Sequence, residues 1–246
     1  MRDTVLIIIT SIRNNLRLKI ALIVYIAVTV ICVSGLVIAF CLFLISPAVD
    51  TGSPDVSELE LYLSLIMYTT CFISVGVNLN AFAFQSMTRE KSGGSIESLL
   101  ATPLKVKDIW IAKSLTIFMP GLILGEIFTL IAMLAVNYIY FVPRIGFLLN
   151  PWIAISSLLA APLIYLCLSL LVHLIGLTGK PATANVIVQI FLPVIITLMI
   201  NLMVRRILDA ASWPFTLANL GIAAAIASSC LHPGPLPTGE RIVLSR

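Results

Sequence analysis

Residues 20–45, IALIVYIAVTVICVSGLVIAFCLFLI, decide the fold, because they form a long apolar run without a single charged side chain. A helix needs about 20 mainly apolar residues to cross a hydrocarbon layer of about 30 Å. This run therefore predicts a membrane-spanning helix. The rest of the chain agrees, since 60% of its 246 residues are hydrophobic and only 11% are charged, far from the composition of a soluble domain.

Five further stretches approach or meet the length of a membrane span. The predicted spans are residues 20–45, 61–84, 114–140, 153–175, 186–203 and 213–230. We therefore expect an all-α, polytopic membrane protein whose single permease-like domain covers residues 1–230. Residues 231–246 differ sharply in composition, because three prolines and two glycines fall within HPGPLPTGERIVLSR. This atypical tail is expected to be disordered.

The lysines and arginines predict the orientation in the membrane, since cytoplasmic segments retain positive charge during insertion. With the N-terminus inside, twelve of the 15 lie on the inner side and only Arg144, Arg205 and Arg206 lie outside. We expect a multi-pass protein of the plasma membrane with both termini in the cytoplasm. The inner twelve are Arg2, Arg13, Arg17, Lys19, Arg89, Lys91, Lys105, Lys107, Lys113, Lys180, Arg241 and Arg246.

The N-terminal segment MRDTVLIIITSIRNNLRLK is predicted to form a helix along the inner membrane surface. Val5, Ile8, Ile9, Ile12 and Leu16 recur at intervals of three and four, which places them on one face. The alternative is that this segment is only the ragged start of the first span.

The loop between the second and third spans carries a short predicted helix. Gly93 and Gly94 permit a sharp reversal of the chain, Ser95 can cap the helix, and Glu97 lies in its first turn. Seven or eight residues do not hold a helix alone, so its apolar stripe must pack against something. That stripe consists of Ile96, Leu99, Leu100 and Pro103. It could rest on lipid headgroups, which Lys105 and Lys107 would favour, or dock into a cytoplasmic partner.

Residues 88–115, TREKSGGSIESLLATPLKVKDIWIAKSL, closely resemble the segment between the second and third spans of type-2 ABC exporter permeases. Two departures from the family pattern are a serine in place of the common threonine at 95, and Ala112 where a glycine usually precedes the lysine. The matching positions are Arg89, Glu90, Gly94, Ser95, Ile96, Glu97, Leu99, Leu100, Thr102, Pro103 and Lys113.

This resemblance implies a function. In the family the segment is the coupling helix, which sits in a groove of the ATP-binding subunit and passes its closure to the membrane helices. The expected assembly has two permease chains, identical or different, and two ATPase chains. ATP and Mg²⁺ are expected in the partner subunit, with no cofactor bound by this chain. The resemblance thus implies a transport subunit that is not an enzyme. The sequence GLTGKP at residues 176–181 agrees with this, because it lacks the spacing of a phosphate-binding loop.

Three polar residues inside the predicted spans are candidates for a translocation path. Glu126 lies near mid-membrane, where a carboxylate is costly and usually faces the protein interior or a cavity. It could bind substrate or a cation, or it could be a hydrogen-bonded acid joining two helices. Asn78 and Asn80 are two residues apart, hence on different helix faces, and are expected to bond to neighbouring helices. His173 is expected to be a structural hydrogen bonder.

Other functions are disfavoured by the residues present. No basic stripe interleaved with aromatics suggests nucleic-acid binding, and the five scattered cysteines suggest neither a disulfide framework nor a metal site. An intramembrane protease would need clustered catalytic residues, which a solitary Glu126 and a distant His173 do not supply. An ATP-independent channel or carrier stays open, as does a degenerate, inactive permease with an altered end. The substrate is not indicated.

Overall fold

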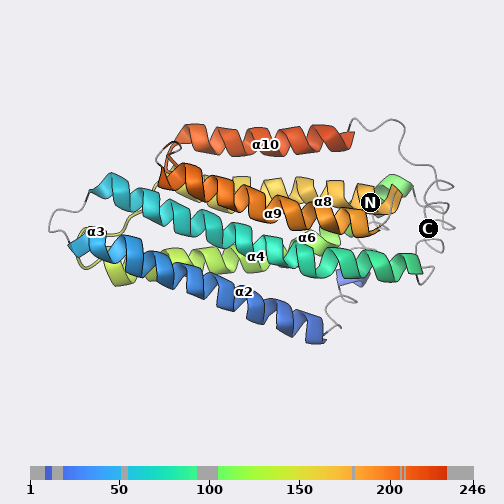
Figure 1. Cartoon of the computed structure of the whole chain (residues 1–246), viewed down its shortest axis with the longest axis horizontal. Helices are drawn as coiled ribbons and strands as arrows, with labels where there is room; N and C mark the ends of the chain where they lie inside the picture. The colour runs from blue at the N-terminus through green and yellow to red at the C-terminus, as the bar shows by residue number, and fades with distance from the viewer. Residues whose placement is uncertain are drawn as a thin grey trace.

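The computed structural model describes residues 9–12, 19–50, 55–92, 105–178, 181–205, 207 and 209–231. In these ranges the chain is a bundle of long helices that run roughly side by side, and no strand occurs in them (Figure 1). The helices are α2 (Lys19–Phe40), η1 (Cys41–Ile45), α3 (Ser46–Asp50), α4 (Val56–Ser92), α6 (Val106–Val136), η2 (Asn137–Phe141), α7 (Pro151–Ile155), η3 (Ser156–Ala160), α8 (Ala161–Thr178), α9 (Pro181–Val204) and α10 (Trp213–Leu231).

Within the described ranges, five helical stretches are long and apolar enough to cross a membrane: Leu22–Asp50, Val56–Leu79, Val106–Phe141, Pro151–Leu177 and Trp213–Cys230. They overlap five of the six predicted spans. The predicted span at 186–203 coincides with α9, but within α9 only a shorter apolar stretch, Pro193–Met203, is found. A membrane-type all-α fold is therefore supported, whereas the sixth crossing stays a prediction.

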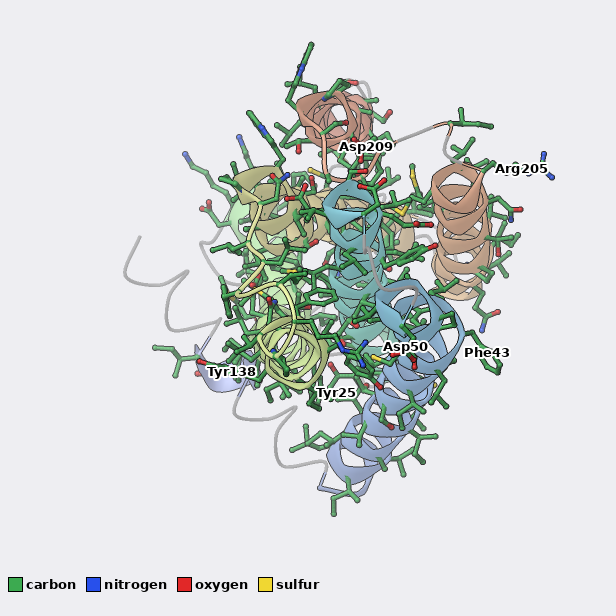
Figure 2. All side chains as sticks on the ribbon, turned by 90° about the vertical axis from the view of Figure 1, so that its left-hand side faces the viewer. Tyr25, Phe43, Asp50, Tyr138, Arg205 and Asp209 are labelled. Atoms are coloured by element: carbon green, nitrogen blue, oxygen red, sulfur yellow. The ribbon has the colours of Figure 1, made fainter. Side chains whose placement is uncertain are left out.

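Helix α4 lies at the centre of the bundle, where it contacts α2, α6, α8 and α9. In its most apolar stretch 72% of the residues are buried, against 22% in α2 at the edge. Leu65, Tyr68 and Phe72 of α4 contribute to the largest buried cluster. Helix α10 packs mainly on α8 (Figures 1 and 2), and its Asn219 also contacts Tyr68 of α4.

Three single turns of wider, π-type helix interrupt the long helices. They are η1 after α2, η2 after α6 and η3 before α8. All three occur toward the end of the bundle where α2 stops and α8 begins, and Cys41, Phe141 and Ile153 from these regions share a second buried cluster. The sequence analysis did not predict these turns, since each leaves the apolar run unbroken.

The two ends of the bundle differ in net charge, although Glu90 and Asp108 lie at the first of them and Arg144 and Arg205 at the second. The end where α4 stops and α6 begins, here called the basic end, carries Arg89, Lys91, Lys105, Lys107 and Lys113 in the described ranges. The opposite, acidic end is where α3 stops and α4 begins (Figure 1). The carboxylates at the acidic end are Asp50, Asp55, Glu58, Glu60 and Asp209. This asymmetry agrees with the predicted orientation, but sidedness itself stays a prediction.

Three predicted features fall largely outside the described residues. Of the N-terminal surface helix only residues 9–12 are described, and they are helical. The predicted coupling helix and the tail beyond residue 231 lie outside the described ranges. On either side of the undescribed residues 93–104, α4 is described as far as Ser92 and α6 begins at Val106.

Candidate functional site

Helices α4 and α6 approach each other closely, and this approach depends on two glycines of α6. A Cβ added to Gly121 would come within 2.8 Å of the Asn78 Cβ, and one added to Gly125 within 2.7 Å of the Val75 Cγ2. Residues four apart on a helix share a face, so both glycines face α4. Small residues with this spacing let membrane helices approach closely.

Asn78 connects the two helices at this crossing. It is 1% exposed, and its Nδ2 donates a hydrogen bond of 2.7 Å to the carbonyl oxygen of Ile117. Pro120, three residues further along α6, disturbs the local ladder of backbone hydrogen bonds, so an extra donor at this turn is favourable. The expectation that Asn78 bonds to a neighbouring helix is confirmed. Its Oδ1 is buried without a partner among the described residues.

Of the other two candidate path residues, Glu126 makes no contact with Asn78 that the described residues show. Asn80 belongs to α4, but its side chain lies outside the described residues. Glu126 follows Gly125 on α6 and is half-buried. It lies between the glycine face and exposed Ile123 and Ile127, which place it at the edge of the lipid-facing surface. No hydrogen bond from the Glu126 carboxylate to another helix is found among the described residues.

Three buried tyrosines tie other helices to α4, and sequence analysis did not identify them. The Tyr25 hydroxyl on α2 donates to the Ser74 carbonyl oxygen at 3.2 Å, and the Tyr165 hydroxyl on α8 donates to that of Phe72 at 2.8 Å. Tyr68 of α4 donates to the Asn219 Oδ1 of α10. Each hydroxyl satisfies its polar end inside an apolar core. The sequence signal for these bonds is a tyrosine in the middle of an apolar run, whose hydroxyl needs a hydrogen-bonding partner on a neighbouring helix.

Near the basic end, α6 and α8 are linked by two further hydrogen bonds. The Trp110 Nε1 donates to the Leu170 carbonyl oxygen at 2.8 Å, and the Ser169 hydroxyl donates to that of Ser114 at 3.1 Å. The His173 Nδ1 lies 3.0 Å from the Ser169 carbonyl oxygen of its own helix, as expected for a structural histidine. Lys113 is half-buried and close enough to His173 to interact with it electrostatically.

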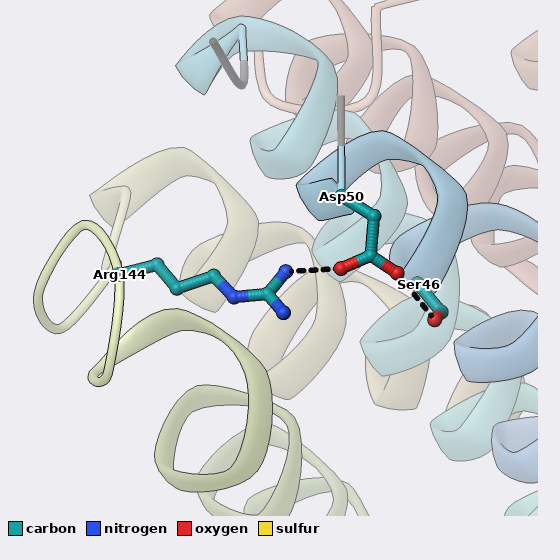
Figure 3. Close-up of polar contacts among 3 residues, drawn as sticks. All are labelled: Ser46, Asp50 and Arg144. Carbon is teal, nitrogen blue, oxygen red and sulfur yellow. Dashed lines mark hydrogen bonds and ion pairs between the residues drawn. The ribbon is translucent and has the colours of Figure 1, made fainter. Parts of the chain in front are cut away.

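At the acidic end, polar contacts join segments that are far apart in the sequence. Figure 3 shows Arg144 reaching Asp50, with Nη1 and Oδ1 2.8 Å apart, while Ser46 donates to the other carboxylate oxygen. The Asn150 Nδ2 bonds the Glu60 Oε2 at 2.9 Å and the Ala211 carbonyl oxygen at 3.2 Å. The first contact joins α3 to the turn after η2, and the second set joins the start of α4 to the turn before α10.

The predicted coupling residues lie at or beyond the edge of the described structure. Glu90 belongs to the last turns of α4, where its side chain lies outside the described residues. Lys113 lies two turns into α6. The remaining ones, Gly94, Ser95, Ile96, Glu97, Leu99, Leu100 and Pro103, fall in the undescribed residues 93–104.

The described residues offer hydrogen-bonded helix contacts rather than a reactive centre. Among them no group of three or more His, Cys, Asp or Glu is placed to hold a metal ion. No family model, curated protein or solved structure matches the chain. The functional argument therefore rests on the residues themselves.

Proposed function

We propose that this chain is the membrane permease subunit of an ATP-driven exporter of the type-2 ABC class. The observation that carries the proposal is the pattern of residues 88–115, which resembles the coupling segment of that family. In this proposal residues 95–103 dock into a separate ATPase subunit in the cytoplasm, where ATP and Mg²⁺ are bound. The chain itself carries out no hydrolysis.

The helices on either side of this segment support the proposal. The apolar run of α4 ends at Phe84, but the helix continues to Ser92, about 12 Å further at 1.5 Å per residue. Helix α6 begins at Val106 at the same end of the bundle (Figure 1). A segment between these two ends would project beyond the apolar layer, where a soluble partner can reach it.

Because α4 and α6 pack against each other, movement of the segment that connects them would be transmitted to the bundle. The two helices contact each other along the face of Gly121 and Gly125, so a force on the connecting segment acts on both. Since α4 also contacts α2, α8 and α9, its displacement would reach most of the bundle. Close-packed helices move as rigid elements, so a docked ATPase could drive an opening between two permease chains.

Co-purification tests the proposal. The tagged chain is isolated together with ATPases encoded beside it and compared with the double variant Glu97→Arg plus Leu100→Asp, with ATP hydrolysis assayed on both. We expect the wild type to retain an ATPase and the variant to lose it, because the variant reverses a charge and places an acid on the apolar stripe.

A matched control is available at the acidic end. Val142→Asp plus Leu149→Arg introduces the same two charged residues at two exposed positions far from the segment, and should retain the ATPase. If well-folded wild-type protein retains no ATPase, the exporter proposal is wrong and an ATP-independent channel or carrier becomes the better hypothesis.

A further inference from the structure

Helix α9 carries a row of polar positions along one face of an otherwise apolar helix. Gln189, Pro193, Thr197, Asn201 and Arg205 are spaced four residues apart, and all five are exposed. We call these five residues the α9 polar stripe. The inward side of the same helix is apolar, since Ile195 is partly buried and Met199 and Met203 are buried against the rest of the bundle.

The α9 polar stripe is unlike the exposed faces of α2 and α6 in the apolar layer. On α6 every exposed position between residues 114 and 136 is apolar, for example Ile123 and Ile131. On α2, between Leu22 and Ile45, the exposed residue with a hydroxyl or amide is Ser34, whose hydroxyl donates to the Val30 carbonyl oxygen of its own helix. Such faces suit contact with lipid tails, whereas the α9 polar stripe does not.

Lipid hydrocarbon chains offer the α9 polar stripe no hydrogen-bonding partners. The Thr197 hydroxyl and the amides of Gln189 and Asn201 lose hydrogen bonds when lipid replaces water, and each unsatisfied group is costly there. Pro193 adds a backbone acceptor, because it lacks the N–H that would bond to the carbonyl oxygen of Gln189. The Asn201 Nδ2 donates to the Thr197 carbonyl oxygen at 2.8 Å, which satisfies one of its donors but leaves the amide exposed.

The surface at this stripe is hollowed. An open groove of about 620 Å³ runs along α9 and is lined by Thr197, Asn201 and Arg205 of the stripe, together with apolar residues beside them. Val194 and Leu198, which are 56% and 49% exposed, form an apolar edge. Arg205 extends away from the bundle at the acidic end (Figure 2). An apolar edge beside a row of hydrogen-bonding groups fits a partner helix of the same character.

We propose that the α9 polar stripe packs against the same stripe of a second copy of this chain. Two copies inserted in the same direction and related by a two-fold axis along the membrane normal bring their α9 helices together in parallel, with equal residues at equal depth. Threonine and asparagine each donate and accept, so Thr197 and Asn201 are complementary to themselves. The two Arg205 guanidinium groups repel, so the helices are closest at Thr197 and diverge toward Arg205.

This inference rests on the proposed function, which calls for two permease chains and for α9 as the fifth of six spans. It goes further in naming the face and the residues that meet. It also excludes the apolar faces of α2 and α6 as the contact between the two copies.

Disulfide trapping in native membranes tests the inference. In a background with all five cysteines replaced by alanine, Thr197→Cys and Asn201→Cys are introduced one at a time and oxidised. Ile131→Cys on α6 and Leu217→Cys on α10 are matched controls, since these positions are 56% and 55% exposed. A disulfide requires Cα atoms about 4.4–6.8 Å apart, so we expect on the order of tenfold more dimer from the stripe than from the controls.

A second variant separates pairing from mere proximity. Thr197→Leu plus Asn201→Leu removes the hydrogen-bonding groups while the helix stays apolar. We expect the purified particle to shift from dimer to monomer by light scattering, with the helical circular dichroism unchanged. An unchanged dimer would overturn the inference, because the stripe would then contribute nothing to association.

The two tests fail independently. If the ATPase co-purifies but the α9 cysteines form no more dimer than the controls, the exporter proposal stands and this inference is wrong. If the α9 cysteines form dimers but no ATPase is retained, the interface is supported, and the chain is a self-associating protein without an ATPase.

Discussion

Asn78 of α4 lies directly against Gly121 of α6, so close that a Cβ on the glycine would come within 2.8 Å of the Asn78 Cβ. The same asparagine donates its Nδ2 hydrogen to the Ile117 carbonyl oxygen, one turn earlier on α6. A small residue and a hydrogen bond therefore fix one crossing. Because α4 is the central helix, this crossing positions much of the bundle.

Replacing Gly121 should destabilise the protein. Gly121→Ala forces the two helices apart at the Asn78 contact, and overpacking of this kind costs about 1 to 3 kcal/mol. Gly35→Ala is the control, since a Cβ there meets nothing within 4 Å, and it should unfold like the wild type. Unfolding by SDS in mixed micelles measures both variants. Equal stability of the two would show that the α4–α6 contact is not tight.

A double-mutant cycle should reveal coupling between Asn78 and Gly121. Asn78→Ala alone removes one interhelical hydrogen bond, worth about 0.6 to 1.7 kcal/mol in a membrane protein. It also removes Nδ2 and Cγ, two of the atoms that an alanine at 121 would meet. Gly121→Ala should therefore cost less in the Asn78→Ala background than in the wild type. If the two single-variant changes in unfolding free energy add up to that of the double variant within about 0.5 kcal/mol, the two residues do not share a contact.

The long apolar runs were sufficient to predict most of the helices. Residues 213–230 were predicted as a span, and the structure has a membrane-length helix with these bounds, Trp213–Cys230. The end of α4 was less predictable from hydropathy, because Arg89, Glu90 and Lys91 end the apolar run without ending the helix. Arginine, glutamate and lysine are good helix formers, so these charges lower the hydropathy without interrupting the helix, which is described as far as Ser92.

The contacts between helices could not be predicted in the same way. That Asn78 would bond to another helix followed from the cost of an amide in hydrocarbon, but its partner depends on how α6 turns after Pro120. Two signals were present in the sequence and were not used. The glycines at 121 and 125 have the spacing of a close helix contact, and the polar residues of α9 recur every four positions. Which face they occupy required the packed bundle.

The orientation can be tested by labelling single cysteines in intact cells. Ser57 at the acidic end and Lys107 at the basic end are both exposed. If positive charge is retained in the cytoplasm, Ser57→Cys should react with a membrane-impermeant maleimide and Lys107→Cys should react only after lysis. A variant with all five native cysteines replaced is the background. The opposite result would mean that the basic end faces outward, where no cytoplasmic ATPase could reach residues 93–104.

The carboxyl group of Glu126 is expected to lower the stability of the folded protein and to be needed for transport. A carboxylate within a membrane helix is unfavourable, and no hydrogen bond from it to another helix is found among the described residues. Glu126→Gln keeps the shape and removes the charge, so we expect stability equal to the wild type or higher by about 1 kcal/mol. If the carboxyl group serves transport, the same variant should lower the ATP hydrolysis of the reconstituted complex.

Ile123→Gln is the matched control for this variant, because it places the same amide one turn earlier, at a position 57% exposed on the lipid-facing side of α6. It should lower stability, since lipid offers the amide no partner. Should Glu126→Gln instead destabilise the protein by more than about 1 kcal/mol while hydrolysis is unchanged, the carboxyl group joins two helices in the membrane and has no part in transport.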